Sequence, residues 1–285
     1  MNPSFRNLCL LFLSVSSVSS ASGLNFRFIA ASDALDPQVL AGFQSAANRW
    51  SSIFDNNVTL TFAVGLKPLS GGNIGQTSDR FVFDTYSDVR TRLMQYGSSS
   101  PIDQLVDQNL PTSSTVPFLI NHTSEGVAIT NDPSGRSIYL DDDQSRDNQY
   151  IQMSYANARA LGLPTSSPFP DDATIYLTSN VSWDFNPADG ITPGSYDFVG
   201  VATHEIAHAL GFMSSVDDID LLSGLSPTHP YSSDAYMLKT LDLFRYSQQS
   251  TAQGVEDMTD DGRTFGRRSV LRAGLGAASA HPPRS

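Results

Sequence analysis

Apolar and polar residues follow two distinct periods along this chain. In several short segments they alternate, which predicts half-buried strands because successive side chains of a strand face opposite sides. The predicted strands cover residues 24–30, 58–64, 173–178 and 181–185, with two short runs inside 127–140.

Elsewhere apolar residues recur every three or four positions, which predicts amphipathic helices. The first opens at Asp36-Pro37, with Asp36 as N-cap and Pro37 in the first helical position. The predicted helices cover residues 37–53, 86–96, 102–110, 150–163 and 199–210. The Gly-rich segment 69–77 predicts a loop.

The last predicted helix carries the sequence His204-Glu205-Ile206-Ala207-His208-Ala209-Leu210-Gly211, which reads H-E-x-x-H-x-x-G. Two histidines four residues apart share one helix face and can bind one zinc ion, with Glu205 beside the metal-bound water as a general base. Gly211 permits the left-handed turn that ends a helix. The motif therefore predicts a zinc-dependent hydrolase. A plain amphipathic helix with two ordinary histidines is the alternative.

The N-terminus predicts secretion. Residues 1–20 combine one basic residue, a short apolar run from Leu8 to Val15 and a Ser-rich end, which is typical of a signal peptide. No later segment is long and apolar enough to span a bilayer. Cys9, the single cysteine, lies inside this peptide, so metal ligands in the secreted part must be His or carboxylate.

Charge narrows the possible partners. The chain has a net charge of −12, which argues against nucleic acid and anionic membranes as partners. We expect a protein or peptide substrate and a monomer. Asn57, Asn121 and Asn180 each begin an N-x-S/T sequon, so the chain can be a glycoprotein if its host glycosylates.

The C-terminal 23 residues differ from the rest. Residues 263–285 are rich in Arg, Ala, Gly and Pro and contain no acidic residue, so we expect a disordered basic tail. The folded part is then residues 21–262, and we expect that domain to be incomplete at its C-terminal end.

With its flanking residues, the segment 199–212 resembles the zincin metallopeptidases, and PLACEHOLDER The runs 179–212, 215–217 and 241–247 are similar to a poorly characterised group of secreted metallopeptidases of bacteria and fungi. This resemblance implies an α/β (α+β) zincin-like catalytic domain, in which a twisted mixed sheet is backed by helices. It also implies one catalytic Zn²⁺ held by His204 and His208, with Glu205 as general base. The segment 173–185 is then a candidate for the sheet beside the cleft.

The third zinc ligand departs from the metzincin pattern, because position 214 is Ser214, a poor ligand. Asp217 follows the Gly211 turn closely and is the first candidate. The alternatives are Asp218, His229, Asp234 and Asp242.

A second metal and a second function stay open. Asp141, Asp142, Asp143 and Asp147 could hold Ca²⁺, although a charge run is more often a solvated turn. Ser214 and the unusual tail also fit a catalytically inactive zincin that acts as a secreted binding glycoprotein. The intact Glu205 favours the enzyme.

Overall fold

The computed structural model describes residues 23–32, 35–96, 104, 108–123, 125, 127–132, 135–225 and 232–259. The predicted signal peptide (1–20), the predicted tail (263–285) and His229 lie outside these residues. Most of the predicted helix 102–110 also lies outside them. Within the described residues, the fold is mixed α/β, as the sequence predicted.

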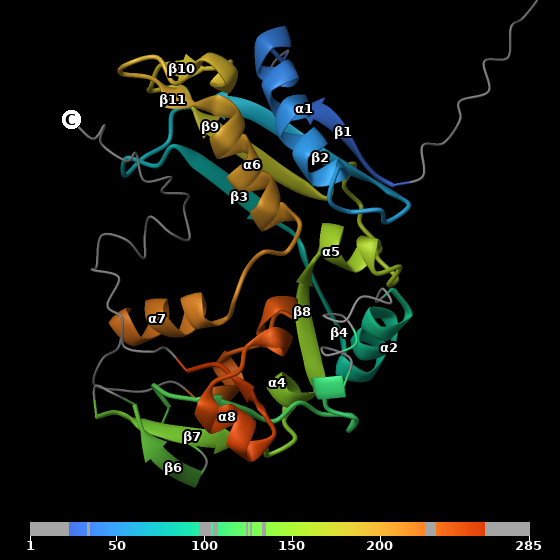
Figure 1. The fold of residues 1–285 in the computed structure, drawn as a ribbon, viewed down its shortest axis with the longest axis vertical. Coiled ribbons are helices and arrows are strands. Elements are labelled where there is room, and N and C mark those ends of the chain that lie inside the picture. The colour runs from blue at the N-terminus through green and yellow to red at the C-terminus, as the bar shows by residue number, and fades with distance from the viewer. Residues whose placement is uncertain are drawn as a thin grey trace, which may run out of the picture.

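The upper part of the molecule in Figure 1 is built on a four-stranded sheet of order β1-β2-β9-β3. β1, β2 and β9 run parallel, and β3 is antiparallel to β9 at the sheet edge. Alternation explains the inner strands, since Leu60, Phe62 and Val64 of β2 are all buried. The strands are β1 (Leu24–Ala30), β2 (Val58–Lys67), β3 (Gly75–Asp79) and β9 (Ala173–Thr178).

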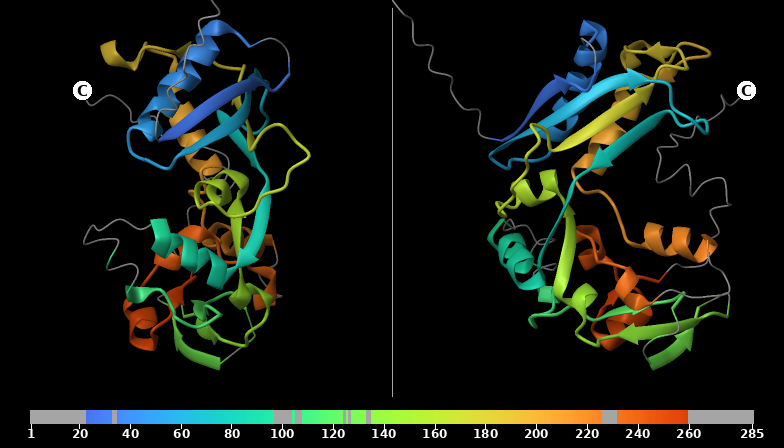
Figure 2. Two further views of the ribbon diagram at one scale, coloured as in Figure 1. Left: turned by 90° about the vertical axis from the view of Figure 1, so that its right-hand side faces the viewer. Right: turned by 180° about the vertical axis from the view of Figure 1, so that it is seen from behind.

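Two helices, α1 (Pro37–Ser51) and α6 (Phe198–Ala209), cover one face of this sheet (Figures 1 and 2). Asp36 caps α1 as predicted, accepting a hydrogen bond from the Gln38 main-chain nitrogen at 2.7 Å. Phe43 of α1 meets Phe198 of α6 edge-to-face, with ring centroids 5.3 Å apart. The core of the upper part therefore lies between these helices and the sheet.

The lower part in Figure 1 has its own apolar core, which includes Tyr86, Phe118, Ile151, Tyr236 and Leu243. β4 pairs with β8 in an antiparallel ribbon, and a second sheet has the order β12-β5-β7-β6. Its strands are β4 (Phe81–Thr85), β5 (Phe118–Ile120), β6 (Val127–Asn131), β7 (Ser137–Asp141), β8 (Tyr150–Ser154) and β12 (Glu256–Asp257).

Short helices fill the remaining positions. They are α2 (Tyr86–Tyr96), α4 (Arg146–Gln149), α5 (Tyr155–Ala160), α7 (Val216–Leu225), α8 (Gln248–Gln253), η1 (Pro187–Asp189), η2 (Ser233–Ala235) and η3 (Thr240–Phe244). A small two-stranded parallel pair, β10 (Trp183–Asp184) with β11 (Tyr196–Asp197), precedes α6.

Three sequence predictions need correction. The expected loop 69–77 contains the start of β3, a polar strand without apolar alternation. The expected helix 150–163 is β8 followed by α5, because Ile151 and Met153 alternate into the core while Ser154 caps the helix. The segment 173–185 is not the sheet edge, since β9 lies between β2 and β3.

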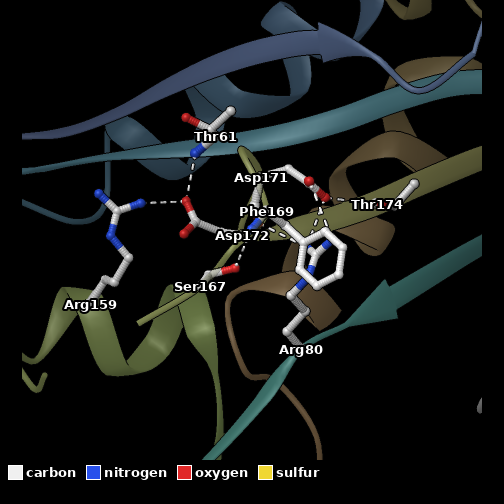
Figure 3. A network of polar contacts seen from close by, with 8 residues as sticks. All are labelled: Thr61, Arg80, Arg159, Ser167, Phe169, Asp171, Asp172 and Thr174. Atoms are coloured by element: carbon white, nitrogen blue, oxygen red, sulfur yellow. Dashed lines mark hydrogen bonds and ion pairs between the residues drawn. The ribbon is translucent and has the colours of Figure 1, made fainter. Parts of the chain in front are cut away.

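Ion pairs fix the junction between the two parts (Figure 3). Arg80, which separates β3 from β4, binds Asp171 at 2.9 Å. The neighbouring Asp172 binds Arg159 of α5 at 2.5 Å and accepts a hydrogen bond from the Thr61 main-chain nitrogen of β2 at 2.7 Å. Both aspartates directly precede β9 and are largely buried, so these bonds hold the start of β9 against elements of both parts.

None of the helices in the described part of the chain combines the length and the apolar character needed to cross a lipid bilayer.

Candidate metal and catalytic site

The predicted motif lies on α6, whose N-terminus is capped by Asp197 through a 2.9 Å hydrogen bond from the Gly200 main-chain nitrogen. One side of the helix carries the buried residues Val201, Ala202, Ile206 and Ala209. His204 and His208 lie at the border of this buried side and are partly exposed. Gly211 follows with a φ of +97°, which confirms the predicted left-handed turn after the helix.

The two histidine rings converge. Their Nε2 atoms are 3.0 Å apart, and the rings are nearly perpendicular at 89°. Burial lowers the pKa of both imidazoles, and the charge of His208 lowers that of His204 further. Both rings are therefore biased toward the neutral form, which has a nitrogen lone pair for a metal ion.

Glu205 points from the helix toward β3 and is only 1% exposed. The Thr77 hydroxyl lies 2.7 Å from its Oε2 and 2.9 Å from its main-chain oxygen. No described residue donates a hydrogen bond to Oε1. Burial raises the pKa of Glu205 to about 7, and the Thr77 hydrogen bond opposes that rise. A carboxyl with a pKa near neutrality can both take and release a proton at physiological pH.

Gly75 makes the close approach of β3 and Glu205 possible. A Cβ at this position would lie 2.3 Å from Oε1 of Glu205, well inside van der Waals contact. Glycine is therefore the residue that leaves room for the carboxylate at this point of the edge strand.

A second buried carboxyl, Asp79, lies near Glu205 at the end of β3. Burial and the charge of Glu205 raise the pKa of Asp79 to about 7. Its Oδ1 receives no hydrogen bond from the described residues. Sequence reasoning missed Gly75, Thr77 and Asp79, because the polar sequence of β3 carries no periodic signal and its contact with α6 joins segments about 128 residues apart.

The candidates for the third ligand lie in different surroundings. Asp218 is bound to Lys239 at 2.6 Å. Asp242 is buried and accepts hydrogen bonds from Ser214 Oγ at 2.5 Å and from the main-chain nitrogens of Ser215 and Lys239.

The remaining candidates are Asp217, which is exposed on α7, and Asp234, which is exposed on η2, while His229 lies outside the described residues. Among the described residues, the single group of three or more His, Cys, Asp or Glu side chains close enough to share a metal ion does not include His204 and His208.

That group consists of Asp141, Asp143 and Asp147, three of the four residues that the sequence offered for Ca²⁺. Each offers a carboxylate oxygen, and these oxygens lie within 4.8 Å of one another. The fourth, Asp142, is exposed and does not belong to the group.

An apolar cavity of about 250 Å³ opens beside the C-terminal end of α6. Leu210 and Phe212 form one side, Leu24 and Phe54 another, and Phe244 of η3 contributes from the lower part. The cavity adjoins the turn that follows the histidine pair in the sequence, and it is large enough for an amino-acid side chain.

Comparisons of the chain with models of protein families, with curated proteins and with solved structures gave no match.

Proposed function

We propose that this chain is a secreted zinc-dependent metalloendopeptidase with His204 and His208 as zinc ligands and Glu205 as general base. The observation that carries the proposal is the 3.0 Å distance between the two Nε2 atoms on one face of α6. The resemblance of the motif segment to zincins favours peptide-bond hydrolysis over other zinc chemistry.

The two histidines suit zinc in distance and in protonation. Two nitrogens bound at about 2.0–2.1 Å to one tetrahedral zinc lie roughly 3.3 Å apart, close to the spacing of the Nε2 atoms. A neutral imidazole is also the form that binds metal, and burial favours it in both rings. When bound, zinc would lower the pKa of a water molecule to about 7 and polarise the scissile carbonyl.

Glu205 would move the protons of the reaction. Its pKa of about 7 lets the carboxylate accept a proton and, once protonated, donate it to the leaving amine. Thr77 holds Oε2, so Oε1 is the oxygen left to carry the proton. Thr77 is therefore a positioning residue, which acts through Glu205.

The surroundings of α6 offer two ways to bind a peptide. β3 is the edge strand beside Glu205, and an edge strand can pair with an extended substrate through main-chain hydrogen bonds. The apolar cavity by Leu210 and Phe212 can receive an apolar substrate side chain.

Asp217 is the third ligand that we favour. Its carboxylate is exposed and has no hydrogen bond or ion pair with the described residues, whereas Asp218 and Asp242 are engaged by Lys239 and Ser214. His229 is the alternative outside these residues. Zinc affinity of Asp217→Asn and His229→Ala, measured against the parent, separates the two.

One observation favours a second function, that of a catalytically inactive zincin-like binding glycoprotein. No described His or carboxylate completes the histidine pair, and Ser214 is hydrogen-bonded to Asp242 instead. A site with two protein ligands holds zinc weakly.

The deciding experiment measures zinc per chain and cleavage of an unfolded protein substrate for the purified secreted protein, His208→Ala and Glu205→Gln. The proposal expects about one zinc per parent chain, little in His208→Ala, and full zinc without cleavage in Glu205→Gln. His122→Ala is the matched control, because His122 contacts Arg136 far from α6 in the sequence. A folded parent that holds no zinc and cleaves nothing overturns the enzyme in favour of the binding protein.

A further inference from the structure

The acidic group Asp141, Asp143 and Asp147 surrounds a single point in the lower part of the molecule. Asp141 is the last residue of β7, Asp143 lies in the following turn, and Asp147 belongs to α4. Three separate backbone segments therefore bring carboxylate oxygens within 4.8 Å of one another. Unscreened carboxylates at this spacing repel each other strongly.

Burial makes this arrangement costly. Asp147 is fully buried and Asp141 is 5% exposed. Ser145 and the Asn148 main-chain nitrogen donate hydrogen bonds to Oδ1 of Asp147, but no described residue donates to its Oδ2. Oδ1 of Asp141 is also buried without a donor. A buried carboxylate oxygen without a partner loses its hydration and gains nothing in return.

No basic side chain compensates the charge. The ion pairs among the described residues involve Asp171, Asp132, Asp172 and Asp218 instead. Arg146, next to Asp147 in the sequence, stacks its guanidinium 4.9 Å over the ring of Phe83. A further carboxylate, Asp234 on η2, adds negative charge that acts on both Asp141 and Asp147. The group thus has the charge and the free oxygens of a cation site.

We propose that Asp141, Asp143 and Asp147 bind a calcium ion, with the free oxygens of Asp141 and Asp147 directed at the metal. All the donors are carboxylate oxygens, which suit hard cations and not the nitrogen ligands that zinc shares with His204 and His208. Calcium fits better than magnesium because it accepts carboxylates in irregular geometry, whereas magnesium demands near-octahedral geometry and retains most of its waters. The exposed Asp143 leaves one side open to water ligands.

Calcium would tie the end of β7 to α4, and through α4 to β8, which directly follows it. The site is therefore structural, and it is independent of whether the chain cleaves peptides. Its effect should appear as calcium-dependent stability.

The test titrates Ca²⁺ into the full secreted chain after removal of metals by a chelator, by calorimetry and by thermal unfolding. The His208→Ala background removes any contribution of the histidine pair. We expect one calcium per chain, and a melting temperature higher by roughly 5–10 °C at a calcium concentration a hundred times the dissociation constant. Mg²⁺ at the same concentration should give a clearly smaller shift.

Asp147→Asn and Asp141→Asn should both lose the calcium heat and the shift. Without calcium these variants should melt no lower than the parent, because each removes an unpaired buried charge, so misfolding is distinguishable from lost binding. Asp142→Asn is the matched control and should respond like the parent, since Asp142 is exposed and outside the group. A parent without a calcium response overturns the site. An equal loss in Asp142→Asn, or an equal response to Mg²⁺, overturns the assignment to these ligands or to calcium.

Discussion

The hydroxyl of Thr77 lies 2.7 Å from Oε2 of Glu205, so a residue of the edge strand holds the carboxyl of the helix motif. Thr77→Val keeps the side-chain shape but leaves this buried oxygen without a donor. We expect the free energy of unfolding to fall by about 1–3 kcal/mol, measured by urea denaturation. Thr77→Ser retains the hydroxyl and should stay close to the parent.

The same substitution tests the proposed base. The Thr77 hydrogen bond lowers the pKa of Glu205, so Thr77→Val should raise that pKa further. If Glu205 is the base, the acidic limb of the pH profile of kcat/KM should move to higher pH in Thr77→Val and not in Thr77→Ser. An unchanged profile in a folded, zinc-loaded Thr77→Val would show that Thr77 does not tune the catalytic proton.

Gly75→Ala tests the space beside Glu205. The added Cβ would lie 2.3 Å from Oε1, so the carboxyl must move. Because a displacement of about 1 Å in a catalytic group can cost ~10²-fold in rate, we expect a large loss of cleavage with zinc content unchanged. Gly65→Ala in β2 is the control, since its nearest neighbour is the edge of the Tyr176 ring at 3.3 Å. Full activity in Gly75→Ala would argue against a fixed Glu205.

The sequence predicted well those elements that carry their own periodic signal. The strand 24–30, the helix that begins at Pro37 and the helix of His204 and His208 occur where alternation, a capping aspartate and a glycine stop indicated them. β3 was missed because its sequence, GQTSD, is polar and is a strand only through pairing with β9. Tertiary pairing overrides local preference in such a segment.

The candidate site divides in the same way. His204, Glu205 and His208 lie within one helical turn, so their spacing alone fixed their mutual position. Thr77, Gly75 and Asp79 reach Glu205 only because β3 occupies the sheet edge beside α6, which no local pattern encodes. The three aspartates of the acidic group were found by their closeness in sequence, but their burial became visible only in the folded chain.

Burial separates the three sequons. Asn121 is fully buried and its amide donates to Asp132 at 3.1 Å, whereas Asn57 and Asn180 are exposed. When the chain is secreted from a glycosylating host, we expect glycans on Asn57 and Asn180 and none on Asn121. Mass spectrometry should show one glycan lost in Asn57→Gln and one in Asn180→Gln. A glycan at Asn121 in the folded secreted protein would contradict its buried position.

Glu256 should make the protein less stable as pH rises. Its side chain is fully buried in β12, and neither carboxyl oxygen receives a hydrogen bond from the described residues. Burial raises its pKa from 4.5 to about 8. Between these values the folded chain binds more protons than the unfolded chain, so the free energy of unfolding falls as pH increases, by up to about 1.4 kcal/mol per pH unit from this group.

Glu256→Gln isolates this contribution, because Asp79, Glu205 and Asp147 also have raised pKa values and act with the same sign. The variant should match the parent near pH 4.5 and exceed its stability at pH 9, measured by urea denaturation. Glu125→Gln is the control, since hydrogen bonds from Ser232 and Ser233 lower the pKa of Glu125 and confine its effect to acidic pH. A difference between Glu256→Gln and the parent that stays constant from pH 5 to 9 would mean that Glu256 is already ionised in the folded chain, and that solvent or a cation reaches a carboxyl that is otherwise enclosed.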